Sequence, residues 1–465
     1  MRTILLFYLL FIVENLYAQT VVQKLDQAWS VFIKDEQLRH AIVGFSVVDS
    51  KTGKPIFERN AQVGLAPAST QKIITSVAAF ELLGKEYRYK TIFRVVKDLH
   101  IDRPPDLEIY SSGDPTFGSW RFSSCTDSAI LNGFVKEFRK KIPVKFGGKL
   151  IAIDSHFGNS LPGGYTWEDM GNYYGAGSRQ LNWRENQYDL YFNSMKSTEV
   201  VLVRVDPEQP QVEFRNFVKS DPSVKGDEII VYSAPKSKII YLEGRMPVSK
   251  NNFIVSGAMT DPAYTFLTTL SKLLKEDSEI EIMGRENMTA PEILKRNGPH
   301  EYQTVYTHYS PRFDTINYHF LRKSINLYGE ALIKTFAFEK LQSGSTESGI
   351  EMVRDFFASK GIEKAALNII DGSGLSPQNR VTSDALVKVL QYARTRPWFS
   401  SFYDALPEYN GMKMKSGSIG GARAYAGYHK ATSGKEYSFS IIVNNFDGSS
   451  AEIVRKMYKL LDILK

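Results

Sequence analysis

The stretch PASTQKIITSVAAFELLG, Pro67–Gly84, decides how the rest of the chain is interpreted. Residues 68–83 contain no Gly or Pro, and Gly84 follows as a C-terminal cap, so we expect a helix there. Apolar residues leave this helix little polar surface, which is typical of a central, buried helix. Ser69 lies in its first turn, and Lys72 lies about one turn further along the same face. Ser-x-x-Lys at the start of a buried helix is one element of an acyl-serine site.

Two further short motifs follow in the order that such a site requires. Ser324-Ile325-Asn326 lies between expected helices over 314–323 and 327–341. Lys415-Ser416-Gly417-Ser418 lies on an expected strand and is Lys-Thr-Gly-Thr with both hydroxyls supplied by serine. Helix start, interhelical loop and strand are the local structures in which these three motifs work together.

Each motif alone is weak evidence for an acyl-serine site, because the chain contains other matches to the same short patterns, which we call decoy motifs. Lys51-Thr52-Gly53 lies between expected strands over 41–48 and 55–58, where polar and Gly residues are typical of a hairpin turn. Ser233-Ala234-Pro235-Lys236 follows a strand-like run, and no helical pattern continues after it. Ser249-Lys250-Asn251 lies in a β-rich region. Only one combination has the right order and local structure throughout.

The pattern of apolar runs predicts a mixed α/β (α+β) fold, with an antiparallel sheet flanked by helices and a large β-rich insert. We expect residues 19–90 and 286–465 to form one domain, which carries all three motifs. Residues 91–285 contain many short β-type runs separated by Gly, Pro, Asn and Asp, and are interpreted as an inserted region of two subdomains.

The N-terminus resembles a secretory signal peptide. Met1–Thr3 is a short positive start, Ile4–Val13 is an apolar run too short to cross a bilayer comfortably, and residues 16–18 offer a cleavage site after Ala18. The alternative is an uncleaved N-terminal anchor. We therefore expect export across the inner membrane to the periplasm, with no integral span after cleavage and at most loose association with the envelope.

Composition excludes several other classes of function. The net charge of +7 is mild for 465 residues, and no long basic run or aromatic-basic motif points to a nucleic-acid partner. Cys125 is the only cysteine, so no internal disulfide is expected. The seven histidines form no His-Glu-x-x-His, and no Gly-x-Ser-x-Gly elbow occurs. We predict no metal and no organic cofactor.

The three motifs together resemble those of penicillin-binding proteins of the D-Ala-D-Ala carboxypeptidase/endopeptidase family, peptidase family S13, the low-molecular-mass class C group. The resemblance covers essentially the whole chain after residue 18, and the large insert between the first and second motifs is typical of that family. GDPTF, DGSGLS and SINLYGEAL also resemble family segments. The departures are Ile325, where Asp is commoner, and Ser416 and Ser418 in place of Thr; none removes a required functional group. The resemblance implies a serine β-lactamase/transpeptidase-like catalytic domain.

The groups in the motifs suggest their roles. A serine hydroxyl needs a base within hydrogen-bond reach, and Lys72 can be that base for Ser69 if burial and a second cation, Lys415, depress its pKa. Ser324 can relay a proton to the leaving amine, while Asn326 can hold the acyl-side amide and orient the base. The family resemblance implies an oxyanion hole formed by two backbone N–H groups, those of Ser69 and Ser418.

The expected substrate is a peptidoglycan peptide that ends in D-Ala-D-Ala. Lys415 with the hydroxyls of Ser416 and Ser418, beside Gly417, suits a substrate with a free terminal carboxylate. We expect D-Ala-D-Ala carboxypeptidase activity, with cross-link endopeptidase activity as an extension, and covalent inhibition by β-lactams such as penicillin. The alternatives are a β-lactamase or β-lactamase-like esterase, and a non-catalytic wall-binding homologue. Ser324 is not the Tyr that class C β-lactamases use, and the intact hydroxyls and lysines disfavour the non-catalytic alternative.

Overall fold

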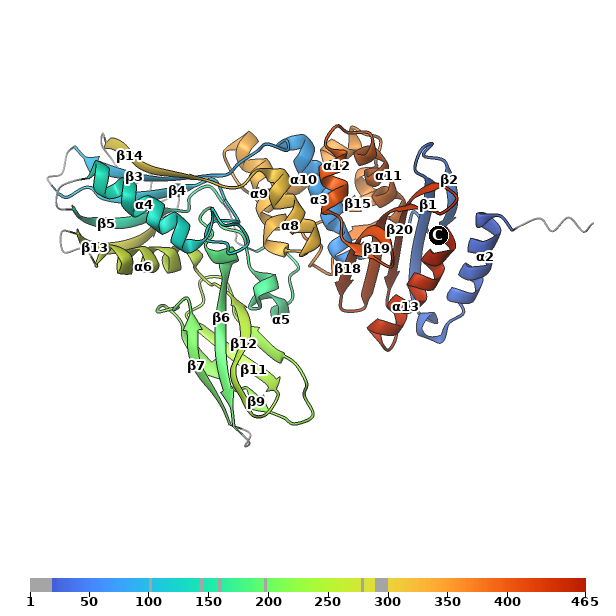
Figure 1. Cartoon of the computed structure of the whole chain (residues 1–465), viewed down its shortest axis with the longest axis horizontal. Helices are drawn as coiled ribbons and strands as arrows, with labels where there is room; N and C mark the ends of the chain where they lie inside the picture. The colour runs from blue at the N-terminus through green and yellow to red at the C-terminus, as the bar shows by residue number, and fades with distance from the viewer. Residues whose placement is uncertain are drawn as a thin grey trace, which may run out of the picture.

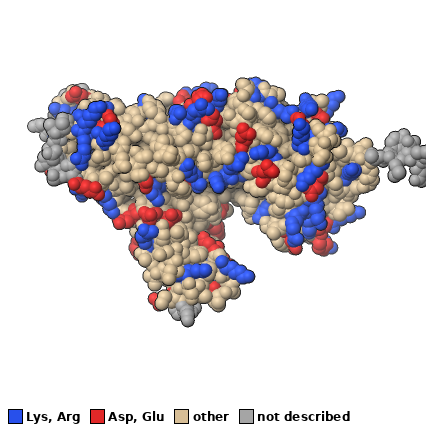
Figure 2. Space-filling view, in the orientation of Figure 1, with Lys and Arg blue, Asp and Glu red and all other residues tan. Residues whose placement is uncertain are grey.

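The computed structural model describes residues 19–99, 103–142, 146–157, 161–195, 199–276, 280–288 and 300–465. The expected signal peptide, residues 1–18, lies outside the described residues. The molecule is elongated, with the segments that precede and follow the insert at one end, a second lobe at the other end, and a third lobe that projects from the side (Figure 1). On the face shown in Figure 2, basic and acidic side chains are interspersed and much of the surface is neutral.

A six-stranded antiparallel sheet organises the first lobe, in the order β17-β18-β19-β20-β1-β2. Its strands are β17 (Glu408–Tyr409), β18 (Met412–Ile419), β19 (Ala422–Lys430), β20 (Glu436–Asn444), β1 (Ile42–Asp49) and β2 (Pro55–Arg59). In this sheet β1 lies directly beside β20, with Ile42 opposite Asn444. The sheet therefore joins an early segment of the chain to a late one.

Two amphipathic helices cover one face of this sheet, α2 (Val21–Phe32) and α13 (Ser450–Leu461), as Figure 1 shows. Trp29 of α2 packs on Phe45 of β1 and Phe57 of β2. Apolar residues recur at helical spacing over 20–38 and predict a single helix there, but α2 ends at Phe32. A separate 3₁₀ turn follows over Glu36–Leu38, because Asp35 caps it by accepting a hydrogen bond from the backbone N–H of Gln37.

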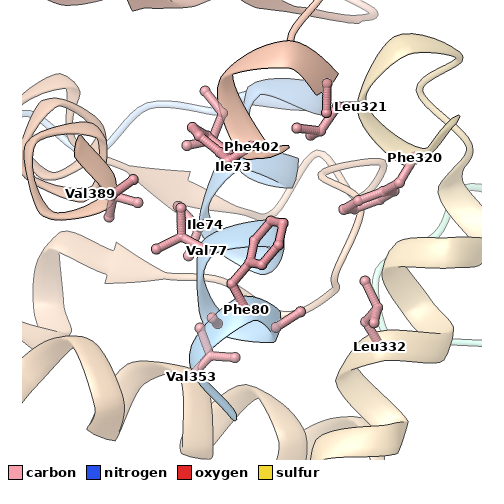
Figure 3. Packing of buried hydrophobic residues seen from close by; sticks show 14 of the residues in the cluster. Ile73, Ile74, Val77, Phe80, Phe320, Leu321, Leu332, Val353, Val389 and Phe402 are labelled. Atoms are coloured by element: carbon pink, nitrogen blue, oxygen red, sulfur yellow. The ribbon is translucent and has the colours of Figure 1, made fainter. Parts of the chain in front are cut away.

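The helix predicted over 68–83 lies at the centre of the core on the other face. It consists of a 3₁₀ turn, η2 (Ala68–Gln71), followed by α3 (Lys72–Leu82). Figure 3 shows its apolar side chains surrounded by residues of five other helices. These are α8 (Phe313–Arg322), α9 (Asn326–Leu341), α10 (Thr346–Ala358), α11 (Ser383–Arg394) and α12 (Phe399–Ala405). The prediction of a buried helix is confirmed, and α12 was not predicted.

The insert contains a five-stranded sheet in the order β13-β5-β4-β3-β14. Its strands are β3 (Lys90–Asp98), β4 (Asp106–Ser111), β5 (Phe146–Ile153), β13 (Ile280–Met288) and β14 (His300–Tyr309). Two helices that were not predicted, α4 (Asp127–Lys141) and α6 (Pro262–Leu274), contribute to the apolar cluster of this lobe. Cys125, which precedes α4, is buried and free.

The third lobe is built from two small sheets. One has the order β12-β6-β7, and the other pairs β11 with β10, β8 and β9. The strands are β6 (Gln187–Ser194), β7 (Val200–Asp206), β8 (Glu213–Asn216), β9 (Lys219–Ser220), β10 (Glu228–Tyr232), β11 (Ile239–Met246) and β12 (Lys250–Ala258). Four of the β-type runs that predicted a β-rich insert, over 149–153, 200–205, 212–217 and 228–232, correspond to β5, β7, β8 and β10.

The chain enters and leaves the insert through neighbouring strands. β14 pairs antiparallel with β3, so Tyr309 lies opposite Lys90. The expected boundary between residues 285 and 286 falls inside β13, and β14 belongs to the insert sheet. We therefore propose a boundary near residue 310 instead.

The predicted fold class is confirmed: the structure is a mixed α/β fold whose antiparallel sheet is flanked by helices. None of the helices in the described ranges is long and apolar enough to span a membrane.

Candidate active site

Ser69 and Lys72 lie where η2 passes into α3. The Nζ atom of Lys72 lies 2.8 Å from the Oγ atom of Ser69, within hydrogen-bond distance. The Lys72 side chain is fully buried, whereas Ser69 is partly exposed and lines a cleft. Ala68, immediately before the serine, has φ +46°, a left-handed conformation that costs a non-glycine residue about 1–3 kcal/mol. Such conformations cluster at functional sites, and this one determines how the serine enters the helix.

The second motif reaches the same lysine from the junction of α8 and α9. Ser324 also has a positive φ, +56°, and Asn326 is the first residue of α9. The Oδ1 atom of Asn326 accepts a hydrogen bond of 2.7 Å from Lys72 Nζ, and its Nδ2 atom donates one of 2.8 Å to the carbonyl of Tyr174 in the insert. The asparagine therefore connects the base, α9 and the insert.

The third motif lies on β18, which packs against η2. The Nζ atom of Lys415 donates hydrogen bonds of 2.9 Å to Ser324 Oγ and to the carbonyl of Ser416. A Cβ atom at Gly417 would lie 2.5 Å from the carbonyl oxygen of Pro67 and 3.1 Å from the backbone nitrogen of Ser69. Glycine is therefore needed at this position, because the strand and the turn that holds the serine approach each other backbone to backbone.

Ser416 and Ser418 differ in their exposure to the cleft. Ser418 is exposed near the end of β18 and lines the cleft, whereas Ser416 is half-buried and is not among the lining residues. The carbonyl of Ser416 accepts a hydrogen bond from Lys415 Nζ. Binding of a substrate carboxylate by the Ser416 hydroxyl stays a prediction.

Burial dominates the electrostatics of both lysines. It lowers the pKa of Lys72 to about 7, against the opposing effect of the carboxylates of Asp371 and Glu330. Burial, together with the positive charge of Lys72, also lowers the pKa of Lys415 well below its usual value. A buried lysine with a pKa of about 7 is partly in its neutral, basic form at physiological pH, and this form can accept the proton of a serine nucleophile.

A cleft of about 660 Å³ opens over these groups. Four motif residues line it, Ser69, Ser324, Asn326 and Ser418. Further lining residues come from the insert, the loop of residues 371–376, the β18–β19 turn and the segment from the end of β20 to the start of α13. These further residues are Asp169, Tyr173, Tyr174, Leu375, Ile419, Gly420, Gly421, Arg423, Phe446, Gly448 and Ser450. The insert therefore forms one wall of the cleft.

A loop that the motif search left without a role also contacts the base. The carbonyl of Ser373 accepts a hydrogen bond of 2.8 Å from Lys72 Nζ. This residue belongs to the DGSGLS segment, in which Asp371 is fully buried, and Glu330 is buried beside it on α9. A single buried carboxylate inside an apolar helix gives no periodic signal. The Gly- and Asp-rich segment indicates only a turn.

The decoy motifs lie elsewhere. Lys51 is exposed at the tip of the β1–β2 hairpin, where Asp49 accepts the N–H groups of Lys51 and Thr52. The prediction of a turn is confirmed. Ser233 directly follows β10, and Ser249 precedes β12, so both lie in the third lobe.

The chain matches the model of one protein family over residues 23–408, described as the D-Ala-D-Ala carboxypeptidase 3 (S13) family. A D-alanyl-D-alanine carboxypeptidase of Actinomadura sp. (strain R39) is 25% identical over 457 residues, covering 90% of this chain and 80% of that protein. The D-alanyl-D-alanine carboxypeptidase DacB of Haemophilus influenzae is 22% identical over 362 residues, covering 75% of this chain and 70% of that protein.

Solved structures share the fold. The crystal structure of penicillin binding protein 4 (DacB) from Haemophilus influenzae matches with a TM-score of 0.75 at 19% identity, covering 96% of this chain and 99% of that one. The same protein complexed with a novel β-lactam matches with a TM-score of 0.71. The agreement spans the insert as well as the segments on either side of it.

Proposed function

Because the chain belongs to the D-Ala-D-Ala carboxypeptidase 3 (S13) family, we propose that it hydrolyses D-Ala-D-Ala peptides through an acyl-serine intermediate. One observation carries this proposal. Three motifs spread over more than 340 residues of sequence meet at one open cleft. Lys72 hydrogen-bonds with Ser69 and Asn326, and Lys415 hydrogen-bonds with Ser324. Together the motifs supply a nucleophile, a base and a second lysine for acyl transfer.

The reaction follows from the positions of these groups. Neutral Lys72 takes the proton of the Ser69 hydroxyl as Oγ attacks the carbonyl carbon of the penultimate D-Ala. The backbone N–H groups of Ser69 and Ser418 stabilise the oxyanion, each such donor commonly contributing about 3 kcal/mol. The C–N bond breaks as the leaving amine gains a proton through Ser324, and D-Ala departs. Water then attacks the ester and restores the serine hydroxyl.

The terminal carboxylate of the substrate has suitable partners at the cleft. Lys415 lies next to Ser324, and a bound carboxylate would favour the protonated form of Lys415, against the effect of burial. The Ser418 hydroxyl lies at the exposed end of the same strand. Hydrogen bonds to charged groups contribute about 1.5–3 kcal/mol each. The proposal therefore includes specificity for peptides with a free C-terminus.

The same site suits two related ligands. A β-lactam offers an amide carbonyl beside a carboxylate, so it should acylate Ser69 and remain bound as an ester. A D,D cross-link has the same type of scissile bond, and the open cleft leaves room for a longer leaving peptide. We propose cross-link cleavage as a second activity, and action in the periplasm, where peptidoglycan lies.

Purified muropeptides test the proposal. Wild-type protein should shorten pentapeptide stems by one D-Ala, and mass spectrometry should show the loss of one residue. Ser69→Ala is the control and should leave the stems intact. Release of D-Ala by the Ser69→Ala variant at the wild-type rate, or opening of β-lactam rings with rapid turnover and no action on stems, would overturn the carboxypeptidase assignment.

A further inference from the structure

The carbonyl of Ser373 determines where the lone pair of Lys72 points. Lys72 Nζ lies within 2.7–2.8 Å of three oxygen atoms, those of Ser69, Asn326 and Ser373. A neutral lysine has two N–H groups and one lone pair, and neither a carbonyl nor an amide oxygen can donate a proton. The two N–H groups are therefore taken by Asn326 and Ser373, so the lone pair faces the serine hydroxyl, the only donor of the three.

Asp371 fixes the loop that carries this carbonyl. Its carboxylate accepts the backbone N–H groups of Gly374 and Ser376, both at 2.7 Å. The Nε2 atom of Gln71, the residue before Lys72, donates to the Asp371 carbonyl at 2.6 Å and to its carboxylate at 2.8 Å. The loop is therefore tied directly to the helix start that holds the base.

Glu330 fixes the same loop from the opposite side. It lies one turn after Asn326 on α9 and is 1% exposed. Its Oε2 atom accepts the backbone N–H of Gly372 at 3.0 Å, and its Oε1 atom accepts the Tyr165 hydroxyl of the insert at 3.1 Å. The same hydroxyl lies 3.3 Å from Ser373 Oγ. The insert therefore reaches the loop through one tyrosine.

Backbone packing leaves this loop no alternative position. A Cβ atom at Gly374 would lie 2.0 Å from the carbonyl oxygen of Ala68, and Gly374 has φ +81°. A Cβ atom at Gly372 would lie 2.2 Å from the carbonyl oxygen of Gly329 on α9. The loop is held between the helix that carries the nucleophile and the helix that carries Glu330.

The ionisable groups that face Glu330 come from every element packed around it. They are Lys72 on α3, Asp371 on the loop, Tyr165 from the insert and Lys334 one turn further along α9. Burial, together with the charge of the neighbouring Asp371, raises the pKa of Glu330 to about 7. A carboxylate at this position favours the protonated form of Lys72.

We propose that Glu330 is a positioning residue for the reaction: with Asp371 and Tyr165 it holds the Ser373 carbonyl against Lys72, and its charge balances that of the lysine. This inference rests on the proposed function, because it assigns Lys72 the role of base. It adds to the three motifs a fourth element of the site, the loop of residues 371–376. It also gives the insert a part in the chemistry.

The pH dependence of acylation tests this role. The rate of labelling by a fluorescent penicillin should rise with pH through the pKa of Lys72, about 7, because only the neutral lysine is a base. In Glu330→Gln the opposing carboxylate is gone, so the pKa of Lys72 falls. The acid limb of the pH–rate profile, the range in which the labelling rate rises with pH, should move to lower pH by about one unit. Tyr165→Phe keeps the carboxyl but removes its donor, so Glu330 binds its proton more tightly, and we expect a smaller shift in the same direction.

Matched controls come from the same helix. Glu339 also lies on α9 and accepts a tyrosine hydroxyl, that of Tyr87 at 2.7 Å. Glu339→Gln and Tyr87→Phe make the same chemical changes away from the base, and their acid limbs should match the wild type. A change in folding alone would lower labelling at all pH values without moving the limb.

Failure of this inference is distinguishable from failure of the proposed function. Wild-type protein that is not labelled at any pH would sink the acyl-serine proposal itself. If the wild type is labelled with an acid limb near pH 7, either of two results shows that the role of Glu330 is wrong. The first is that the acid limbs of both Glu330→Gln and Tyr165→Phe lie at the same pH as in the wild type or at a higher pH. The second is that the acid limb of Glu339→Gln shifts by as much as that of Glu330→Gln.

Discussion

Gly417→Ala should separate the nucleophile from the rest of the site. The added Cβ would lie 2.5 Å from the carbonyl oxygen of Pro67, whereas ordinary van der Waals contact begins at 3.4 Å, so β18 and η2 must separate by about 0.9 Å. Ser69 lies on one side of this contact and Ser418 on the other, so the two proposed oxyanion donors move apart. A displacement of about 1 Å costs about 100-fold in rate, or about 2.7 kcal/mol of barrier.

The assay is the second-order rate constant for acylation by a fluorescent penicillin, followed by stopped flow. Overpacking also destabilises a protein, by about 1–3 kcal/mol, so the rate must be measured well below the melting temperature of each variant. Gly226→Ala is the control, because Gly226 lies in the third lobe and a Cβ there has no heavy atom within 4 Å. Gly226→Ala should acylate within about twofold of the wild type. A folded Gly417→Ala variant that acylates within about threefold of wild type would refute the reasoning.

Three further outcomes follow from the site. Lys51→Ala should leave kcat/KM unchanged, because Lys51 is exposed at a hairpin tip. Lys415→Ala should lower kcat/KM by orders of magnitude. Equal losses in the two variants would mean that the Lys415 triplet was wrongly assigned to the site. Benzylpenicillin should acylate only Ser69, and peptide mapping that places the adduct on Ser233 would contradict the assignment. Amidating the substrate's C-terminus should cost at least about tenfold in kcat/KM, and Ser418→Ala should lower activity on the acid more than on the amide. An equal decrease for acid and amide would show that Ser418 does not bind the carboxylate.

The sequence predicted the parts of the site that local patterns encode. The spacing of apolar residues, and the residues that begin and end each run, indicate three segments. These are an apolar helix with Ser69 and Lys72 in its first turn, a loop between two helices, and a strand near the C-terminus. The structure brings these segments together. Their order along the chain suggested which side chains meet, but spacing could not show that Ser418 lines the cleft whereas Ser416 does not.

Contacts between segments distant in sequence were not predictable in the same way. Glu330 and Tyr165 are single polar residues within apolar surroundings, and their meeting depends on how the insert packs against α9. The strand β14 was missed because the insert was expected to end at residue 285 and helices were expected to follow. The helix α4 was missed although Ile130, Phe134 and Phe138 recur at helical spacing, so that signal was present and was overlooked among the strand-like runs.

The pairing of β1 with β20 has a consequence for the order of folding. Proteins are synthesised from the N-terminus, and segments fold as their partners emerge. β1 (residues 42–49) must wait for β20 (residues 436–444), whereas all of the strands of the insert are made by residue 309. Loops that close over such long sequence separations form slowly. The insert can therefore fold while its host is still an open chain, and Ser69 meets Lys415 only in the last stage of assembly. Until then the nascent chain lacks an assembled site, so we expect it to have no hydrolytic activity.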